Sequence, residues 1–452
     1  MAAQGSMALG GGTGGDKGLR MRLADTFRLA WADQDLRKRL QFILFIFAVY
    51  SFGVHVPVPV PGIDPAQMQK LLENNQFFNL INTIGGGAFK RVSIFALGLG
   101  PYISASIIMQ VLTYAFPQWK EELKEGGEYA RRKQNQRTRL LMMGLCIFQG
   151  MGILQMLTRA LAMPLAPFSM IAILVFWTAG SMFMLWLGEQ LTEKGIGNGT
   201  SLLIFAGICN GVPNVVDIVY KALKSGTVHW PQIVMVILLY AGTTWLVVLF
   251  TIAQRRIPIE HIRRNFGTKS MGGKTSYLPF AVNLAGVMPI IFALALLSLP
   301  KMFATAVPTN SPLYQGIDTL EHFLYPDFTR WQGYVGAVVY TLMIFFFTFF
   351  YTSLQYNVDD IADNLKRGGS FIRGIRPGKQ TRDFLDKVIS RITFVGAGFL
   401  SVVALTQFVL PLIAPIQNLG LIGGTSLLIM VSVALETMRQ IEANLLSKQY
   451  DS

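Results

Sequence analysis

Ten separate apolar stretches, each close to the length that crosses a lipid bilayer, constrain this chain more than any other feature. A helix needs about twenty mostly apolar residues to span the hydrocarbon core, because it rises only about 1.5 Å per residue. Only 14% of the residues are charged, against roughly 25% in an ordinary soluble domain. We therefore expect an all-α integral membrane protein. The predicted spans lie near residues 40–58, 92–113, 140–160, 168–188, 200–223, 231–253, 280–299, 332–355, 391–413 and 424–445.

The basic residues predict which side of the membrane each loop occupies. The two ends of the chain and alternate loops hold 31 of the 39 Lys and Arg residues. Short cytoplasmic loops carry such an excess, so we expect both termini and the loops 114–139, 254–279 and 356–390 to be cytoplasmic. The formal net charge of +14 then indicates anionic membrane lipids and cytoplasmic partners.

Ten spans divide into two halves of five. We expect a cytoplasmic N-terminal arm over 1–38, an N-terminal half over 39–226, a C-terminal half over 227–445 and a cytoplasmic C-terminal tail over 446–452. An odd number of spans in each half makes the second half enter from the opposite side, which permits an inverted repeat. Channels and transporters place their translocation path between such halves.

Residues 77–89, FFNLINTIGGGAF, are apolar but too short to span the membrane. Irregular elements persist at membrane depth only where they line a cavity or are buried in protein. Two interpretations follow with equal weight from the residues alone: a re-entrant plug, or an interfacial helix on the outer side.

The sequence lacks the patterns of a membrane enzyme, with no HExxH, GxSxG or GxGD motif, and its four histidines are scattered. We expect no metal and no cofactor. The spans hold few ionisable groups near their centres, which disfavours an ion-coupled solute transporter, the main alternative function. Cys146 and Cys209 lie in apolar runs and are predicted to be buried, inert thiols.

Six long motifs, in order along the chain, carry a resemblance to a known family. They are FALGLGPYISASIIMQVLT at 95–113, EGGEYARRKQNQRTR at 125–139, WLGEQLTEKGIGNGTSLLIFAGI at 186–208, VNLAGVMPIIFA at 282–293, IADNLKRGGSFIRGIRPGKQT at 361–381 and GGTSLLI at 423–429. Together they resemble the SecY/Sec61-alpha family, the central pore subunits of the Sec protein translocon. The resemblance covers the chain from about residue 20 to the C-terminus.

The resemblance implies ten helices in two pseudo-symmetric inverted five-helix halves around a central pore, with a plug half-helix. It implies a protein-conducting channel of the bacterial inner membrane, not an enzyme. Such a channel passes unfolded secretory polypeptides and releases transmembrane segments laterally, driven by an external motor ATPase or the ribosome. The implied partners are the SecE and SecG subunits, the SecA motor, the ribosome with its RNA, signal peptides and unfolded preproteins.

The family's pore is closed by a ring of apolar side chains near the membrane midplane. Matched motif to motif, the ring residues are Leu99, Ile103, Thr200, Ile204, Ile291 and Ile429. An apolar constriction in a water-filled funnel blocks ions by dewetting. Thr200 departs from the family's aliphatic residue, so either the seal is weaker at this point or the register is shifted.

The resemblance also favours the plug interpretation of 77–89 and implies two further sets of residues. The plug residues are Phe77, Phe78, Leu80, Ile81, Ile84, Gly85, Gly86 and Gly87. A lateral gate would be held closed by Ser104, Gln149 and Asn283. The residues that dock the motor or the ribosome would be Arg255, Arg256, Arg373 and Arg376, since clustered basic residues attract RNA phosphates.

Overall fold

The computed structural model describes residues 23–58, 82, 85–161, 166–261, 265–266, 269–270, 276–304, 311–326, 328, 331–414 and 423–451. The chain divides into two units. The first comprises Met1–Thr227, Ile416–Ile422 and Ile429–Ser452, and the second comprises Val228–Pro415 and Gly423–Leu428. The expected division between halves at residue 226 lies beside this boundary, whereas helix α16 (Gly424–Asp451) is shared by both units.

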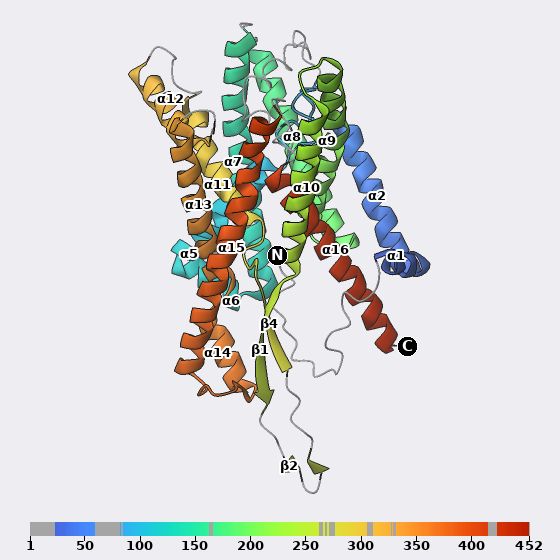
Figure 1. Ribbon diagram of the computed structural model, residues 1–452, viewed down its shortest axis with the longest axis vertical. Coiled ribbons are helices and arrows are strands. Elements are labelled where there is room, and N and C mark those ends of the chain that lie inside the picture. Colours follow the sequence, from blue (N-terminus) through green and yellow to red (C-terminus); the bar gives the residue numbers. More distant parts are fainter. Residues whose placement is uncertain are drawn as a thin grey trace. The chain divides into compact units, whose positions relative to one another are not determined.

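The first unit is a helical bundle (Figure 1). Besides its part of α16, its described helices are α1 (Leu23–Ala32), α2 (Gln34–Val54), α5 (Gly100–Ala115), α6 (Pro117–Glu125), α7 (Gly127–Leu161), α8 (Pro167–Lys194) and α9 (Gly199–Lys224). Helix α7 packs along α5 and α8, and α2 packs against α8 and α9. The side chains of Met142, Leu154 and Trp177, from α7 and α8, are at most 2% exposed and form the centre of this core.

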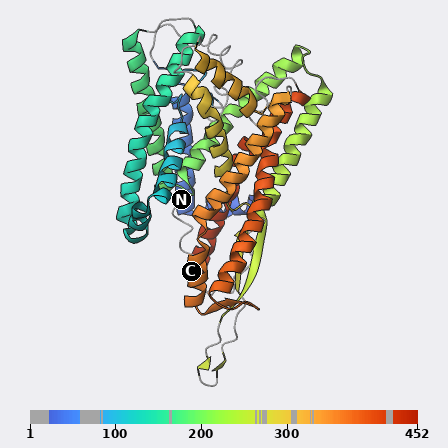
Figure 2. The same cartoon turned by 90° about the vertical axis from the view of Figure 1, so that its left-hand side faces the viewer.

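The second unit combines helices with a small sheet. Its described helices are α10 (Trp230–Ile252), α11 (Met288–Ala304), α12 (Pro312–Leu324), α13 (Trp331–Gln355), α14 (Val358–Arg367) and α15 (Lys379–Ile413). Helix α13 packs against α11, α12 and α15; its contact with α15 is seen from the side in Figure 2.

Five short strands among the described residues correct the expectation of an all-α chain. They are β1 (Gln254–His261), β2 (Asn265–Phe266), β3 (Lys269–Ser270), β4 (Ser276–Ala281) and β5 (Ser370–Ile372). The antiparallel order is β4-β1-β5, with Gln254 opposite Ala281 and Ile259 opposite Ile372, while β2 pairs with β3 (Figure 1). Alternate residues of β1 and β4 are buried against α14 and α15, so the strands follow the period-two pattern of a half-buried sheet. The apolar residues that alternate are Ile257, Ile259, Leu278 and Phe280.

Six helical stretches among the described residues are long and apolar enough to cross a membrane. They are Gly127–Gln155, Pro167–Lys194, Gly199–Lys224, Trp230–Ile252, Trp331–Arg367 and Lys379–Ile413. The other four predicted spans correspond to α2, α5, α11 and α16. Helices α5 and α11 have only 16 and 17 residues, and α2 and α16 contain several charged side chains. The chain is thus a mostly helical membrane protein, and the count of ten spans stays a prediction.

Helix α10 is the least buried of these six stretches. Only 17% of its apolar window is buried inside the protein, and the helix contains no charged residue. Large side chains such as Leu238 and Trp245 are about two-thirds exposed. Lipid accounts for an apolar surface of this extent, because water would make it costly.

Three local expectations were wrong. Residues 85–89 form consecutive turns and not the end of a half-helix, because Gly86 and Gly87 have φ of +65° and +87°. The seventh span, expected over 280–299, begins as a helix only at Met288, after the positive φ of Gly286. Cys146 is buried as expected, whereas Cys209 is exposed.

Candidate functional site

Two predicted ring residues lie at the start of α5. Leu99 is the N-cap residue and is 3% exposed, and its carbonyl oxygen accepts a 3.0 Å hydrogen bond from the Ile103 backbone N–H. The Ile103 side chain is half-buried. Residues four apart lie on the same side of a helix, so Leu99 and Ile103 present apolar groups along one line. Pro101 fits the first turn because its missing N–H would have no helical partner.

Thr200 and Ile204 occupy the first turns of α9. The side chain of Asn198 caps this helix by accepting hydrogen bonds from the N–H groups of Thr200 and Ser201. Its Oδ1 also accepts the hydroxyl proton of Thr200, at 2.7 Å. The Thr200 methyl lies against α8, 3.1 Å from the position that a Cβ on Gly188 would occupy. Both branches of the Thr200 side chain therefore have partners within the first unit.

The remaining ring residues lie on α11 and α16. Ile291 is half-buried in the first turn of α11, and Ile429 is 9% exposed on α16. Ile291 belongs to the second unit and the other five ring residues to the first. The structure thus brings Leu99 next to Ile103 and Thr200 next to Ile204 along their helices, and the closed ring stays a prediction.

Most of the predicted plug lies outside the described residues. This holds for Phe77, Phe78, Leu80, Ile81 and Ile84. Gly85, Gly86 and Gly87 are described, and the Gly86 carbonyl oxygen accepts a 3.0 Å hydrogen bond from the side-chain amide of Asn210 on α9. Asn82 accepts hydrogen bonds from the N–H groups of Gly87 and Lys90. Sequence reasoning missed Asn210, because nothing in the local pattern links residues 124 positions apart.

The predicted gate residues are divided between the units. Ser104 on α5 and Gln149 on α7 are half-buried, on two helices that pack together. Asn283 belongs to the second unit and precedes α11, so it is not within a helix. Its Oδ1 is buried and has no hydrogen-bond partner among the described residues. The gate assignment stays a prediction.

The four predicted docking arginines lie around the sheet of the second unit, and all are exposed. Arg255 and Arg256 are in β1, and Arg373 follows β5 with its Nε 3.8 Å from the carboxylate of Glu260. The backbone carbonyl of Arg376 accepts a 3.0 Å hydrogen bond from the Thr381 hydroxyl. This bond fixes the turn between Gly374 and Gly378, both with positive φ, and leaves the Arg376 guanidinium to project from it.

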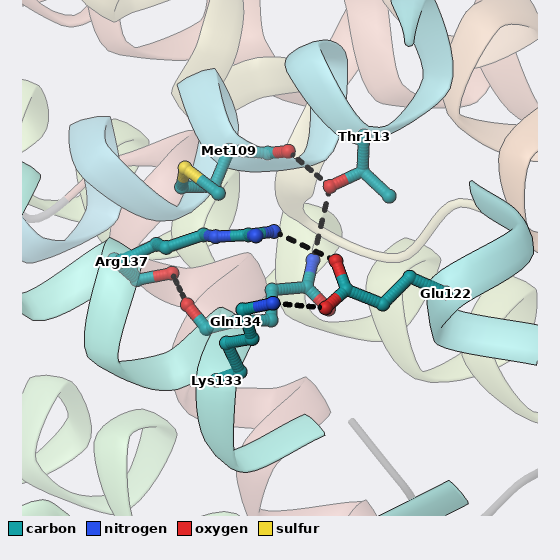
Figure 3. A network of polar contacts seen from close by, with 7 residues as sticks. Met109, Thr113, Glu122, Lys133, Gln134 and Arg137 are labelled. Carbon is teal, nitrogen blue, oxygen red and sulfur yellow. Dashed lines mark hydrogen bonds and ion pairs between the residues drawn. The ribbon is translucent and has the colours of Figure 1, made fainter. Parts of the chain in front are cut away.

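Besides the role of Asn210, the sequence did not predict a polar network between α5, α6 and α7 (Figure 3). Glu122 on α6 accepts hydrogen bonds from Lys133 at 2.6 Å and from Arg137 at 3.2 Å. Gln134 donates to the Thr113 hydroxyl, and the Arg137 guanidinium lies 4.5 Å from the ring centre of Trp119. The hydrogen bond from Lys133, followed by the charge of Arg137, lowers the pKa of Glu122 below its usual value.

Nothing in this arrangement points to bond-making chemistry. No group of three His, Cys, Asp or Glu side chains within the described ranges could hold a metal ion. What the geometry offers is aliphatic side chains at the starts of α5 and α9, and a basic, exposed surface on the sheet of the second unit.

Comparison with known proteins gives a consistent result. The SecY family model matches residues 93–438. The protein translocase subunit SecY of Streptomyces galbus is 37% identical over 446 residues, covering 94% of this chain and 98% of the relative. That of Escherichia coli K12 is 38% identical over 426 residues, covering 92% and 94%.

Solved structures share the fold at lower sequence identity. A protein-conducting channel superposes with a TM-score of 0.65 at 20% identity, covering 92% of this chain and 94% of that chain. A SecY protein whose plug domain stabilizes the closed state gives a TM-score of 0.66 at 20% identity, with the same coverage. Sec61 in the canine ribosome-channel complex gives 0.62 at 18% identity, again over 92% and 94%.

The extent of the family match, together with identities above one third over nearly the whole chain, shows that this chain belongs to the SecY family of protein translocase subunits and is a protein-conducting channel of the membrane, not an enzyme.

Proposed function

We propose that this chain passes unfolded secretory polypeptides across a bacterial plasma membrane and releases transmembrane segments sideways into lipid. The observation that carries the proposal is the match of residues 93–438 to the SecY family, because this range contains every predicted ring residue. The excess of basic residues at both ends and in alternate loops supports cytoplasmic termini. Ten spans in two inverted halves agree with this charge pattern.

The path for the polypeptide would run through the ring of Leu99, Ile103, Thr200, Ile204, Ile291 and Ile429. Ile103, Ile204 and Ile291 are half-buried, which supports this, since a pore-lining side chain contacts protein on one side only. Leu99 and Ile429 are buried. Aliphatic groups offer no hydrogen bonds that would retain a passing chain. In a narrow constriction they also exclude water and ions.

A plug over residues 77–89 would close the outer side of this path. Two observations support it: the anchoring of Gly86 to α9, and the similar SecY structure whose plug domain stabilizes the closed state. Ser104, Gln149 and Asn283 would hold the lateral exit closed. The Oδ1 of Asn283 is buried without a hydrogen-bond partner in the described part of the chain, which supports a polar contact across such a gate, because an unpaired buried acceptor is costly.

The exposed arginines around β1 and β5 would dock the energy source. The sheet is packed against α14 and α15, with Arg255 and Arg256 in β1 and with Arg373 and Arg376 just after β5, so all four exposed side chains stand on a fixed backbone. Clustered guanidinium groups suit RNA phosphates and carboxylates. We propose the SecA motor and the ribosome as partners here, and SecE and SecG as membrane subunits. The similar Sec61 chain in a ribosome-channel complex supports the ribosome as a partner.

The direct test is transport by the purified chain, reconstituted with SecE and SecG in vesicles containing anionic lipid. With SecA and ATP, an unfolded preprotein with a signal peptide should become protected from added protease. Omitting ATP should abolish protection. Saturable uptake of a small solute, with no protected preprotein, would instead favour the secondary-transporter alternative.

A further inference from the structure

Residues 85–99 of the first unit form a loop enclosed by three helices. The Ser93 hydroxyl donates a 2.8 Å hydrogen bond to the carbonyl oxygen of Gly53 on α2. The ring of Phe95 stacks on Tyr50 of α2 and on Phe183 of α8. Gly180 on α8 leaves no room for a Cβ, because the backbone of Ile94 lies against it. The loop is therefore packed into the bundle along most of its length.

The same loop holds a strained backbone. Val92 has φ of +49°, a conformation that a β-branched residue rarely adopts. Hydrogen bonds at Val92 retain it: its N–H donates to the Phe89 carbonyl, and its own carbonyl accepts from the Val58 N–H at 2.9 Å. Strained residues persist only where the surrounding contacts fix them, so each external contact of this loop opposes a tendency to relax.

Asn210 on α9 contacts the N-terminal end of this loop, at Gly86. Its Nδ2 donates to the Gly86 carbonyl oxygen at 3.0 Å, and its Oδ1 accepts from the Ser51 hydroxyl at 3.4 Å. A Cβ on Gly86 would lie 3.0 Å from the Gly207 carbonyl oxygen and 3.1 Å from the Tyr50 hydroxyl. The Gly86 backbone thus lies directly against α2 and α9, and the Asn210 bond is its side-chain tether to α9.

We propose that Asn210 is a positioning residue that holds the strained loop 85–99 in the closed channel, so that breaking the Asn210–Gly86 bond is a step in opening. This inference rests on the proposed channel function. Gly86 belongs to the described end of the predicted plug segment 77–89, so the tether on Gly86 sets how readily this end of the segment leaves α9.

The test compares Asn210→Ala and Asn210→Asp with a matched control, Asn214→Ala. Asn214 is the same residue type one turn further along α9, and it is exposed. Asp keeps the size of Asn but removes the N–H donor. Hydrogen exchange of residues 85–92 and chloride leak from resting vesicles are measured for the channel reconstituted with SecE and SecG.

Both Asn210 variants should raise the exchange rate and the leak by about two- to twelvefold, the population shift that a typical net hydrogen bond produces. Asn214→Ala should match the wild type. Unchanged exchange and leak in both Asn210 variants would overturn the proposal. ATP-driven preprotein import by the wild type, measured in the same vesicles, separates the two questions: its absence would refute the proposed function, while faster exchange of 85–92 would still show the tether.

Discussion

Arg139 on α7 donates hydrogen bonds to both carboxylate oxygens of Glu189 on α8, from Nη2 at 2.6 and 2.7 Å, with a third from Nε at 3.2 Å. The pair lies where two predicted spans, 140–160 on α7 and 168–188 on α8, are expected to meet the cytoplasm. Its side chains are 46% and 32% exposed, so water and salt reduce the attraction. A multiple hydrogen bond of this kind nevertheless fixes the orientation of α7 and α8 relative to each other at this point.

Breaking the Arg139–Glu189 pair should lower the stability only slightly, but it should remove the interaction energy between the two side chains. We expect Glu189→Gln and Arg139→Lys each to destabilise the protein by about 0.5–1 kcal/mol, because exposed ion pairs contribute no more than this. The double variant should cost less than the sum of the two. Thermal unfolding of the wild type, the two single variants and the double variant, in detergent at low and high salt, measures this interaction energy. Strictly additive effects at low salt would show that the two side chains do not interact.

The Glu122 network should make the α6 hairpin sensitive to acid. A carboxyl whose pKa is lowered on folding stabilises the folded chain fully above its unfolded pKa, near 4.5, and this contribution is lost as pH falls through the lower folded pKa. Hydrogen exchange of α6, corrected for intrinsic rates, should therefore rise as the pH falls below about 4.5.

Glu122→Gln is the control for this pH effect, since it keeps the shape and removes the titration. The variant should show faster exchange of α6 at neutral pH and no further change in acid. A wild-type hairpin whose corrected exchange is independent of pH would contradict the role of the Glu122 carboxylate.

Thr200→Val tests whether the hydroxyl of this ring residue reaches the pore. The hydroxyl is hydrogen-bonded to Asn198 and the methyl lies against Gly188, so we expect the resting ion leak to be unchanged. Stability should fall by about 1 kcal/mol, the net contribution of one hydrogen bond. Asn198 keeps its two backbone donors in the variant, so the helix cap should survive. A clear drop in leak would show that the hydroxyl wets the constriction.

Arg376→Ala should weaken docking without weakening the fold. Its guanidinium is exposed, and the bond that fixes its turn uses only the backbone carbonyl. We expect at least tenfold weaker binding of SecA or ribosomes, about 1.4 kcal/mol, at unchanged thermal stability. Lys379→Ala removes the same charge nearby from an exposed site. Equal losses from both variants would indicate general electrostatic attraction and not a specific arginine contact.

The long apolar helices could be predicted from the sequence because lipid selects composition directly. Helices α8, α10 and α13 begin within one residue of the predicted spans, and each is apolar on nearly all sides. Strands β1 and β4 were missed although Ile257, Ile259, Leu278 and Phe280 alternate as strands require. Only two alternating apolar residues occur in each strand, within or at the edge of a strongly basic loop. This is a much weaker indication of secondary structure than the long apolar runs of the membrane spans.

Other parts of the site could not be predicted because they depend on contacts distant in sequence or on single dihedral angles. The Asn210–Gly86 bond joins residues 124 positions apart, and neither residue type specifies such a partner. The late start of α11 follows from the φ of Gly286, which glycine permits but does not require. The methyl of Thr200 meets α8 only because Gly188 leaves space there.

Site-specific crosslinking from Ile291 to a preprotein stalled midway through the channel tests the polypeptide path most directly. A photoreactive residue at 291 should crosslink strongly to the stalled chain with SecA and ATP, and not without ATP. The same residue at position 238, on the lipid-exposed face of α10, should not crosslink to the hydrophilic part of the preprotein. Equal crosslinking from positions 291 and 238, or none from 291, would contradict a path through the predicted ring.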